Sequence, residues 1–199
     1  MSDAARASRL PETVEEFLVW PGDSRAKHYE LVDGVVRAMA PGSTTHATIQ
    51  GNLGFLIGAH LRTTRSACRL LVTPGIVPRV NAARNFRVPD LGVTCVPDTA
   101  RQIAMPEPIL LVEILSPSNK AATWSNIWTF GSIPSLREIL VVQSIKIEAQ
   151  ILRRGDDGGW PDNPSAFGED DNLVLASLGL SCAVTEFYTG THFLDARRG

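Results

Sequence analysis

Two short apolar segments in the middle of the chain, Leu91–Val96 and Ile109–Leu115, have the length and the Val, Ile and Leu content of buried strands. Alternate residues of the second segment point to opposite faces, and both faces are apolar apart from Glu113. An ionised carboxylate in such a strand is costly unless a metal ion, a cation or hydrogen bonds compensate for its burial. A second acid, Asp90, opens the first segment. The pattern therefore makes Asp90 and Glu113 candidate metal ligands.

These two acids leave two interpretations open. Asp90 follows a proline, which is a common turn position, and an acid at a strand end often only caps a helix or accepts from a loop amide. The segment Ser116–Asn119 favours a metal site, because it ends the strand abruptly and offers N-cap side chains for a helix that begins near Asn119. A strand carboxylate beside a helix N-terminus is a suitable environment for an anion and a metal.

The N-terminal third is predicted to form a helix, a hairpin and a longer helix. Pro11–Trp20 has the pattern of a short amphipathic helix. Asp33 and Gly34 lie between two apolar runs within 28–39 and predict a tight β-hairpin turn. Ser43 and Thr44 can cap a helix that runs to about Thr63 with an apolar stripe along one face.

Three polar residues of this region are further site candidates. Glu30 lies on the first hairpin strand, where it is either an exposed edge-strand acid, as the pattern alone favours, or a third carboxylate of the site. His46 and Gln50 lie one turn apart at the N-terminal end of the apolar face of the long helix. They could line a cleft there, although a core or capping role is the more common one for such a histidine.

The rest of the chain alternates strands, one helix and loops. The patterns predict one or two strands within Cys68–Val80, a helix from Asn119 to about Gly131, and a strand pair at Glu138–Val142 and Lys146–Leu152. Residues 153–172 are rich in Gly, Asp and Pro and are predicted to be a loop. A short strand near Leu173–Ala176 and a small helix at Val184–Tyr188 follow.

Composition limits the class of protein. The 199 residues are 44% hydrophobic and 20% charged, which suits one globular domain over residues 11–195 after a disordered segment, 1–10. We find no apolar run long enough to span a membrane and no apolar signal core. Cys68, Cys95 and Cys182 lack metal-ligand spacing and are predicted to be free thiols in the cytoplasm.

The net charge of −2 gives no whole-molecule basic field for nucleic acid. Six arginines that cluster in the sequence could form a local basic patch, although a solvated surface is the favoured interpretation: Arg62, Arg65, Arg69, Arg79, Arg84 and Arg87.

The order of these motifs resembles the PD-(D/E)XK restriction-endonuclease-like superfamily, and more closely the bacterial Uma-two family of endonucleases. Over roughly residues 10–190, the resemblance is carried by YELVDGVV, THATIQGNL, RVPDLGV, ILLVEILSPSN and IPSLREILVV. It implies an α/β (α+β) restriction-endonuclease-like fold, in which helices flank a central mixed β-sheet and an N-terminal β-hairpin is added. It also implies a homodimer and cleavage of DNA phosphodiester bonds that depends on Mg²⁺ or Mn²⁺.

Carried over to this chain, the resemblance assigns the Pro-Asp aspartate to Asp90, the acid of the (D/E)xK element to Glu113 and the hairpin glutamate to Glu30. Such acids suit the chemistry, because Mg²⁺ takes carboxylate oxygens and waters as ligands and stabilises charge on a transferring phosphoryl group.

The chain departs from the family pattern at the lysine. The superfamily lysine, two residues after the acid, corresponds to Leu115. Many Uma-two members instead carry an aspartate and a lysine in the next helix, about where this chain has Thr123 and Asn126. Lys120 is the nearby candidate for the cationic role, and it could equally be a solvated lysine.

Three functions follow from these patterns. The first is a Mg²⁺-dependent endonuclease in which the metal ligands Asp90 and Glu113 act with a supporting acid, a cation and two polar neighbours: Glu30, Lys120, His46 and Gln50. The second is a catalytically weakened nuclease-fold module that binds nucleic acid or a protein, as the missing lysine and the acidic net charge favour. The third is an unrelated metal-dependent hydrolase, which is supported only by the presence of two carboxylates and a histidine.

Overall fold

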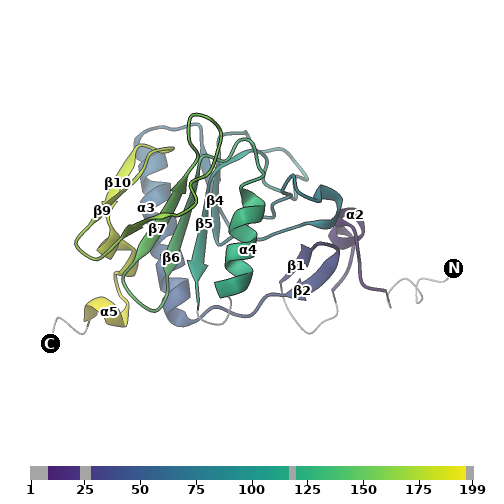
Figure 1. Ribbon diagram of the computed structural model, residues 1–199, viewed down its shortest axis with the longest axis horizontal. Coiled ribbons are helices and arrows are strands. Elements are labelled where there is room, and N and C mark those ends of the chain that lie inside the picture. Colours follow the sequence, from purple (N-terminus) through teal and green to yellow (C-terminus); the bar gives the residue numbers. More distant parts are fainter. Residues whose placement is uncertain (1–8, 23–27, 117–119, 196–199) are drawn as a thin grey trace.

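The computed structural model describes residues 9–22, 28–116 and 120–195, and its centre is a six-stranded sheet of order β3-β4-β5-β6-β7-β8 (Figure 1). Only the β5–β6 pair is parallel and the other pairs are antiparallel, so the sheet is mixed. The strands are β3 (Arg69–Val72), β4 (Leu91–Thr94), β5 (Pro108–Leu115), β6 (Glu138–Gln143), β7 (Ala149–Arg153) and β8 (Ser165–Phe167).

Helices and two hairpins surround this sheet, with α3 and α4 on opposite sides of it (Figure 1). The helical segments are α2 (Val14–Leu18), α3 (Thr44–Thr63), α4 (Lys120–Phe130) and α5 (His192–Asp195), with 3₁₀ turns η1 (Ala82–Arg84) and η2 (Val184–Tyr188). The hairpins are β1 (Tyr29–Val32) with β2 (Val35–Ala38), and β9 (Asn172–Leu175) with β10 (Leu180–Ala183). No helix in the described part of the chain is long and apolar enough to cross a membrane.

The central strand β5 contributes to two hydrophobic layers. One face packs with the apolar stripe of α3, and this layer includes Leu110, Val112, Ile114, Ile49, Leu53 and Ile57. The other face packs with α4, and this layer includes Leu111, Leu115, Ile127 and Phe130. Each fully buried side chain of this size stabilises the fold by about 1.5–3 kcal/mol. Alternation along β5 places Glu113 on the α4 face, between Leu111 and Leu115.

The N-terminal hairpin is attached to the segment that leads into β4. Asp33 and Gly34 have φ values of 52° and 81°, as a type I′ turn requires. Leu31 and Phe86 exchange two backbone hydrogen bonds of 2.9 Å each. Asn85 donates from its amide to Asp33 Oδ1 at 2.9 Å. These contacts bring β1 close to the residues just before Asp90.

The predicted fold class is confirmed, and the main differences lie in the C-terminal part and at the cysteines. The predicted loop 153–172 contains β8, and an additional strand, β10, lies between the strand and the small helix predicted for the C-terminal part. The prediction of free thiols is wrong for Cys68 and Cys95, which form a disulfide next to the β3–β4 pair, whereas Cys182 is a buried free thiol. The disordered segment predicted for 1–10 lies mostly outside the described residues.

Glu138, at the start of β6, joins the sheet to the C-terminal hairpin. Its buried carboxylate accepts from Arg153 Nε at 2.8 Å and from the backbone N–H groups of Ala176 and Ser177 at 3.1 and 2.8 Å. The Ser177 hydroxyl donates to the same carboxylate at 2.5 Å. A buried carboxylate with this many partners is a structural anchor rather than a reactive group.

We expect Glu138→Ala to lower the free energy of unfolding by about 3 kcal/mol, because it leaves two backbone donors and one guanidinium without their acceptor. Urea denaturation followed by circular dichroism measures the change. The matched control is Glu15→Gln on exposed α2, which should change stability by less than about 0.5 kcal/mol. Equal stability of the two variants would contradict the anchor role.

Candidate active site

The sheet register brings Asp90 beside Glu113. Leu91 pairs with Val112 across the antiparallel β4–β5 ladder, so the preceding residue, Asp90, lies next to Glu113. Asp90 Oδ2 accepts from the backbone N–H of Ile114 at 2.6 Å, which fixes the carboxylate against β5. The two acids that the sequence singled out therefore lie at the same end of the sheet.

Glu30 reaches the same region from β1. Its Oε1 accepts from the backbone N–H of Val88 at 2.7 Å, two residues before Asp90. Glu30 is half-buried, which differs from the exposed edge-strand acid that the pattern favoured. Burial raises the pKa of Glu30, and the hydrogen bond from Val88 and the charge of Arg87 act in the opposite direction.

His46 and Gln50 both hold Asp90 from the N-terminal end of α3. His46 Nε2 lies 3.1 Å from Asp90 Oδ1, and Gln50 Nε2 donates to the Asp90 main-chain oxygen at 2.9 Å. Ser43 caps the helix by accepting from the His46 N–H at 3.1 Å. Gly42 allows the close approach of the ring, because a Cβ at this position would lie 2.8 Å from His46 Nδ1. Two α3 side chains thus fix the orientation of Asp90.

Glu113 is the least compensated acid of this group. It is 6% exposed, and its Oε1 has no hydrogen-bond partner among the residues that the structure describes. Burial raises its pKa well above the ordinary value, and the negative charges of Asp90 and Glu30 raise it further. A hydrogen bond from Asn126 and the charge of Arg87 oppose these effects less strongly. The arrangement favours either a protonated Glu113 or a cation beside it.

Arg87 and Asn126 also belong to this site, although the sequence did not identify them as such. Arg87 is 2% exposed, so it belongs neither to a basic surface patch nor to the solvated surface that the sequence favoured for it. Its Nη1 donates to Asn126 Oδ1 at 2.5 Å and its Nε donates to Asn85 Oδ1 at 3.2 Å. The available signal was its place in RVPDLGV, three residues before the aspartate.

The cationic role predicted for Lys120 is untested. Lys120 is the first residue of α4, and its side chain lies outside the described part of the structure. Leu115, at the position of the superfamily lysine, is 2% exposed and packs in the apolar layer under α4.

A divalent cation fits the chemistry of Asp90 and Glu113. In the ranges 9–22, 28–116 and 120–195, no three His, Cys, Asp or Glu side chains are grouped in a way that could hold a metal ion. Mg²⁺, however, is usually bound by one or two carboxylates, with waters and substrate phosphates as the other ligands. Glu113, whose Oε1 has no partner among the described residues, and the adjacent Asp90 supply the two carboxylates that such a Mg²⁺ site needs.

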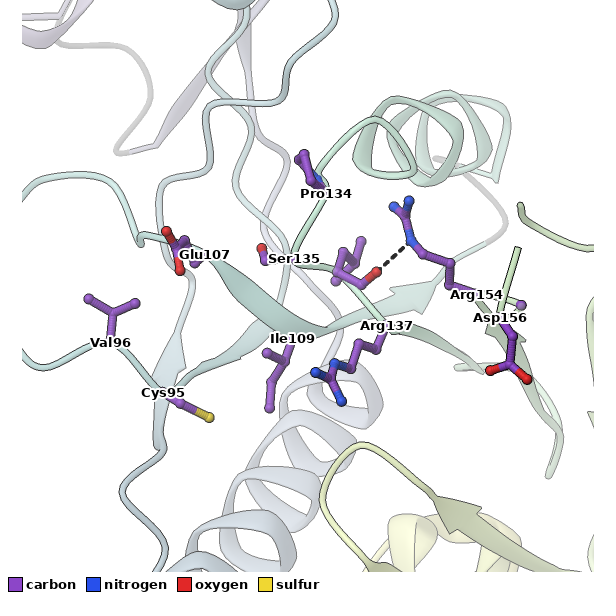
Figure 2. Close-up of a pocket in the computed structure, with 11 residues that line it drawn as sticks. Cys95, Val96, Glu107, Ile109, Pro134, Ser135, Arg137, Arg154 and Asp156 are labelled. Carbon is purple, nitrogen blue, oxygen red and sulfur yellow. Dashed lines mark hydrogen bonds between the residues drawn. The ribbon is translucent and has the colours of Figure 1, made fainter. Parts of the chain in front are cut away.

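A hollow of about 600 Å³ lies at the other end of β5, next to Ile109 (Figure 2). Arg154 Nε donates to the Leu136 carbonyl there at 2.8 Å, the bond dashed in Figure 2. Its other guanidinium nitrogens donate to the carbonyls of Gly131, Ile133 and Gly158. None of the predicted site residues lines this hollow. The Arg154 guanidinium at this hollow is therefore engaged in hydrogen bonds to the main chain.

Comparison with known proteins now identifies the family. Residues 14–185 match the model of the Uma2 (Uma-two) family, which is described as "Putative restriction endonuclease". The chain belongs to the Uma2 family. A Synechocystis protein described as "Uncharacterized protein slr1290" is 34% identical over 181 residues, which cover 90% of this chain and 92% of that protein.

The fold of this Uma2 protein matches a solved structure. The crystal structure of "a putative nuclease belonging to DUF820" from Anabaena variabilis superposes with a TM-score of 0.73 at 18% identity. The match covers 90% of this chain and 98% of the Anabaena chain. At this identity the match establishes a shared fold.

We expect the Glu113 carboxyl to make stability fall with rising pH in the metal-free protein. Because its pKa is raised in the folded state, the native protein retains a proton that the unfolded chain releases at about pH 4.3. The stabilisation present below that pH is lost as pH rises through the folded-state pKa. Glu113→Gln should remove this dependence and raise the Tm at pH 8 by roughly 2–4 °C or more, the shift that 1 kcal/mol produces in a chain of this size.

Calorimetric unfolding between pH 4 and pH 8 in the presence of a chelator measures this difference. Glu15→Gln, an exposed glutamate, is the control and should follow the wild type at every pH. A Glu113→Gln variant less stable than wild type at pH 8, or displaced equally at all pH values, would contradict the prediction.

Proposed function

We propose that this Uma2 protein is a metal-dependent endonuclease that hydrolyses DNA phosphodiester bonds, with Asp90 and Glu113 as metal ligands. One observation carries the proposal: the buried Glu113 Oε1 has no partner among the described residues and lies beside the carboxylate of Asp90. The buried carboxylate of Glu113 and the partly buried one of Asp90 repel each other, and a divalent cation is the partner that would let both ionise. Family membership supplies the reaction type.

The residues around the two ligands have distinct roles in this proposal. His46 and the Ile114 N–H each bind one Asp90 oxygen and so fix the carboxylate plane, while Gln50 fixes its main chain. Glu30 is a supporting acid, held by the Val88 N–H. A bound Mg²⁺ or Mn²⁺ supplies stabilisation of the charge that develops on the phosphoryl group.

The partner, the assembly and the location of the protein belong to the same proposal. DNA is the proposed substrate and a homodimer the proposed assembly, and a cytoplasmic location is part of the same hypothesis. Lys120, at the start of α4, is the proposed cation near the substrate.

Alanine variants of the two ligands test the proposal. We expect Asp90→Ala and Glu113→Ala to lower Mg²⁺- or Mn²⁺-dependent cleavage of single- and double-stranded DNA by more than about 100-fold, beyond the usual effect of losing an outer-shell partner. Circular dichroism should show that both variants remain folded. Asp98→Ala is the control, because Asp98 is an exposed carboxylate beyond the far end of β4 and should leave cleavage unchanged. A wild-type protein that cuts neither substrate with either metal would end the catalytic proposal.

The second candidate function is a catalytically weakened nuclease-fold module that binds nucleic acid or a protein. It is favoured by Leu115 and Asn126, which occupy the positions where a lysine is expected. Calorimetry separates the two candidates, since a pure binding module should show no Mg²⁺ or Mn²⁺ binding that depends on Asp90.

A further inference from the structure

The charge of the site is unbalanced without an internal cation. Glu30, Asp90 and Glu113 place three carboxyl groups around the ends of β4 and β5, and of the two glutamates Glu113 is buried and Glu30 half-buried. A bound divalent ion carries two positive charges, one fewer than three ionised carboxylates. Among the described side chains, Arg87 is the buried arginine whose charge acts on both Glu30 and Glu113.

The structure fixes the Arg87 guanidinium in one place. Nε is bound to Asn85, and Asn85 in turn donates to Asp33 Oδ1 at 2.9 Å and to the Val80 carbonyl at 3.1 Å. At 2% exposure the group is too enclosed to approach a substrate phosphate directly. The Arg87 backbone is held separately, by two hydrogen bonds with Ile76, so the strand pairing does not depend on this side chain.

Asn126 links the guanidinium to the acids. Its Oδ1 accepts from Arg87 Nη1 at 2.5 Å, and hydrogen bonding from its side chain is one of the effects that lower the pKa of Glu30 and the pKa of Glu113. Since a carboxylate only accepts, the amide N–H₂ of Asn126 must be turned towards the glutamates. The arginine therefore polarises the amide that contacts the acids and determines which of its ends faces them.

We propose that Arg87 is a positioning residue of this site, a fixed cation that acts through Asn126 to keep Glu30 and Glu113 arranged for a divalent metal. The inference rests on the proposed function. A point charge buried in the protein is screened far less than one on the surface. Removing it would leave the acids to repel one another across a weakly polar layer, and the metal would have to overcome that repulsion.

Calorimetric titration of the full-length protein with Mn²⁺ tests the role without relying on cleavage. We expect Arg87→Met, which keeps an apolar stem, to weaken Mn²⁺ binding by about 10- to 100-fold, as the loss of an outer-shell partner does. Arg87→Lys should retain most of the affinity. In the Arg87→Met background, Asn126→Lys places an ammonium where the amide now contacts both glutamates, and it should recover much of the lost affinity.

Arg154→Met is the matched control, because this arginine donates only to main-chain carbonyls away from the site in the bonds described above. It should lower stability while leaving Mn²⁺ affinity unchanged. Each variant is checked for folding by circular dichroism and thermal unfolding.

The outcomes separate the two hypotheses. Wild type that binds no Mn²⁺ ends the proposed function and this inference together. Wild type that binds Mn²⁺ in an Asp90-dependent way, with folded Arg87→Met binding equally well, overturns only the role of Arg87. The same conclusion follows if Arg154→Met loses as much affinity as Arg87→Met, or if neither lysine variant restores binding in a folded protein.

Discussion

The placement of a carboxylate on a buried central strand of the sheet is the constraint on which this site depends. Glu113 lies on β5 between two leucines of the α4 layer, where the ionised form is costly. The described structure leaves one of its oxygens without a partner. The burial of Glu113 costs stability, and it leaves in the fold a carboxylate that favours a positive charge beside it. This is the physical basis of the proposed metal site.

Long-range contacts, rather than local ones, assemble the surroundings of Glu113. The hairpin acid Glu30 is bound to a backbone donor 58 residues away, and Gln50 on α3 is bound to a carbonyl 40 residues away. The β4–β5 register adds Asp90. Three chain segments thus converge on one end of the sheet, and each is fixed by backbone groups that cannot easily shift. Such anchoring keeps like charges close together despite their repulsion.

Arg87 and Asn126 bear on the absence of the lysine that the superfamily carries at the position of Leu115. Leu115 continues the apolar layer beneath α4, and a charged side chain there would be buried in it. Arg87 instead enters from the segment before β4 and reaches the acids through Asn126 on α4. Among the described residues, the positive charge of Arg87 is therefore buried within the fold and linked to the site through Asn126. That position suits the ordering of ligands more than contact with a substrate.

The sequence alone determined the elements whose signals are local. Short apolar runs rich in Val, Ile and Leu identified β4 and β5, Asp33-Gly34 identified the hairpin turn, and the apolar stripe identified α3. A buried acid in an apolar strand likewise pointed to Glu113. Each of these signals depends on residues a few positions apart, so it survives without knowledge of the fold.

Only the tertiary structure decided which long polar side chains point inwards. Arg87 belongs to an arginine-rich stretch, and apart from its place three residues before Asp90 nothing in the sequence distinguishes it from its exposed neighbours. In the fold it is bound by Asn85 and Asn126 and is buried. The Cys68–Cys95 disulfide and the short strands β8 and β10 likewise depend on partners distant in the chain or weakly marked in it. Local patterns fix backbone form because near neighbours set it, whereas the environment of a flexible side chain is set by whatever the rest of the fold packs around it.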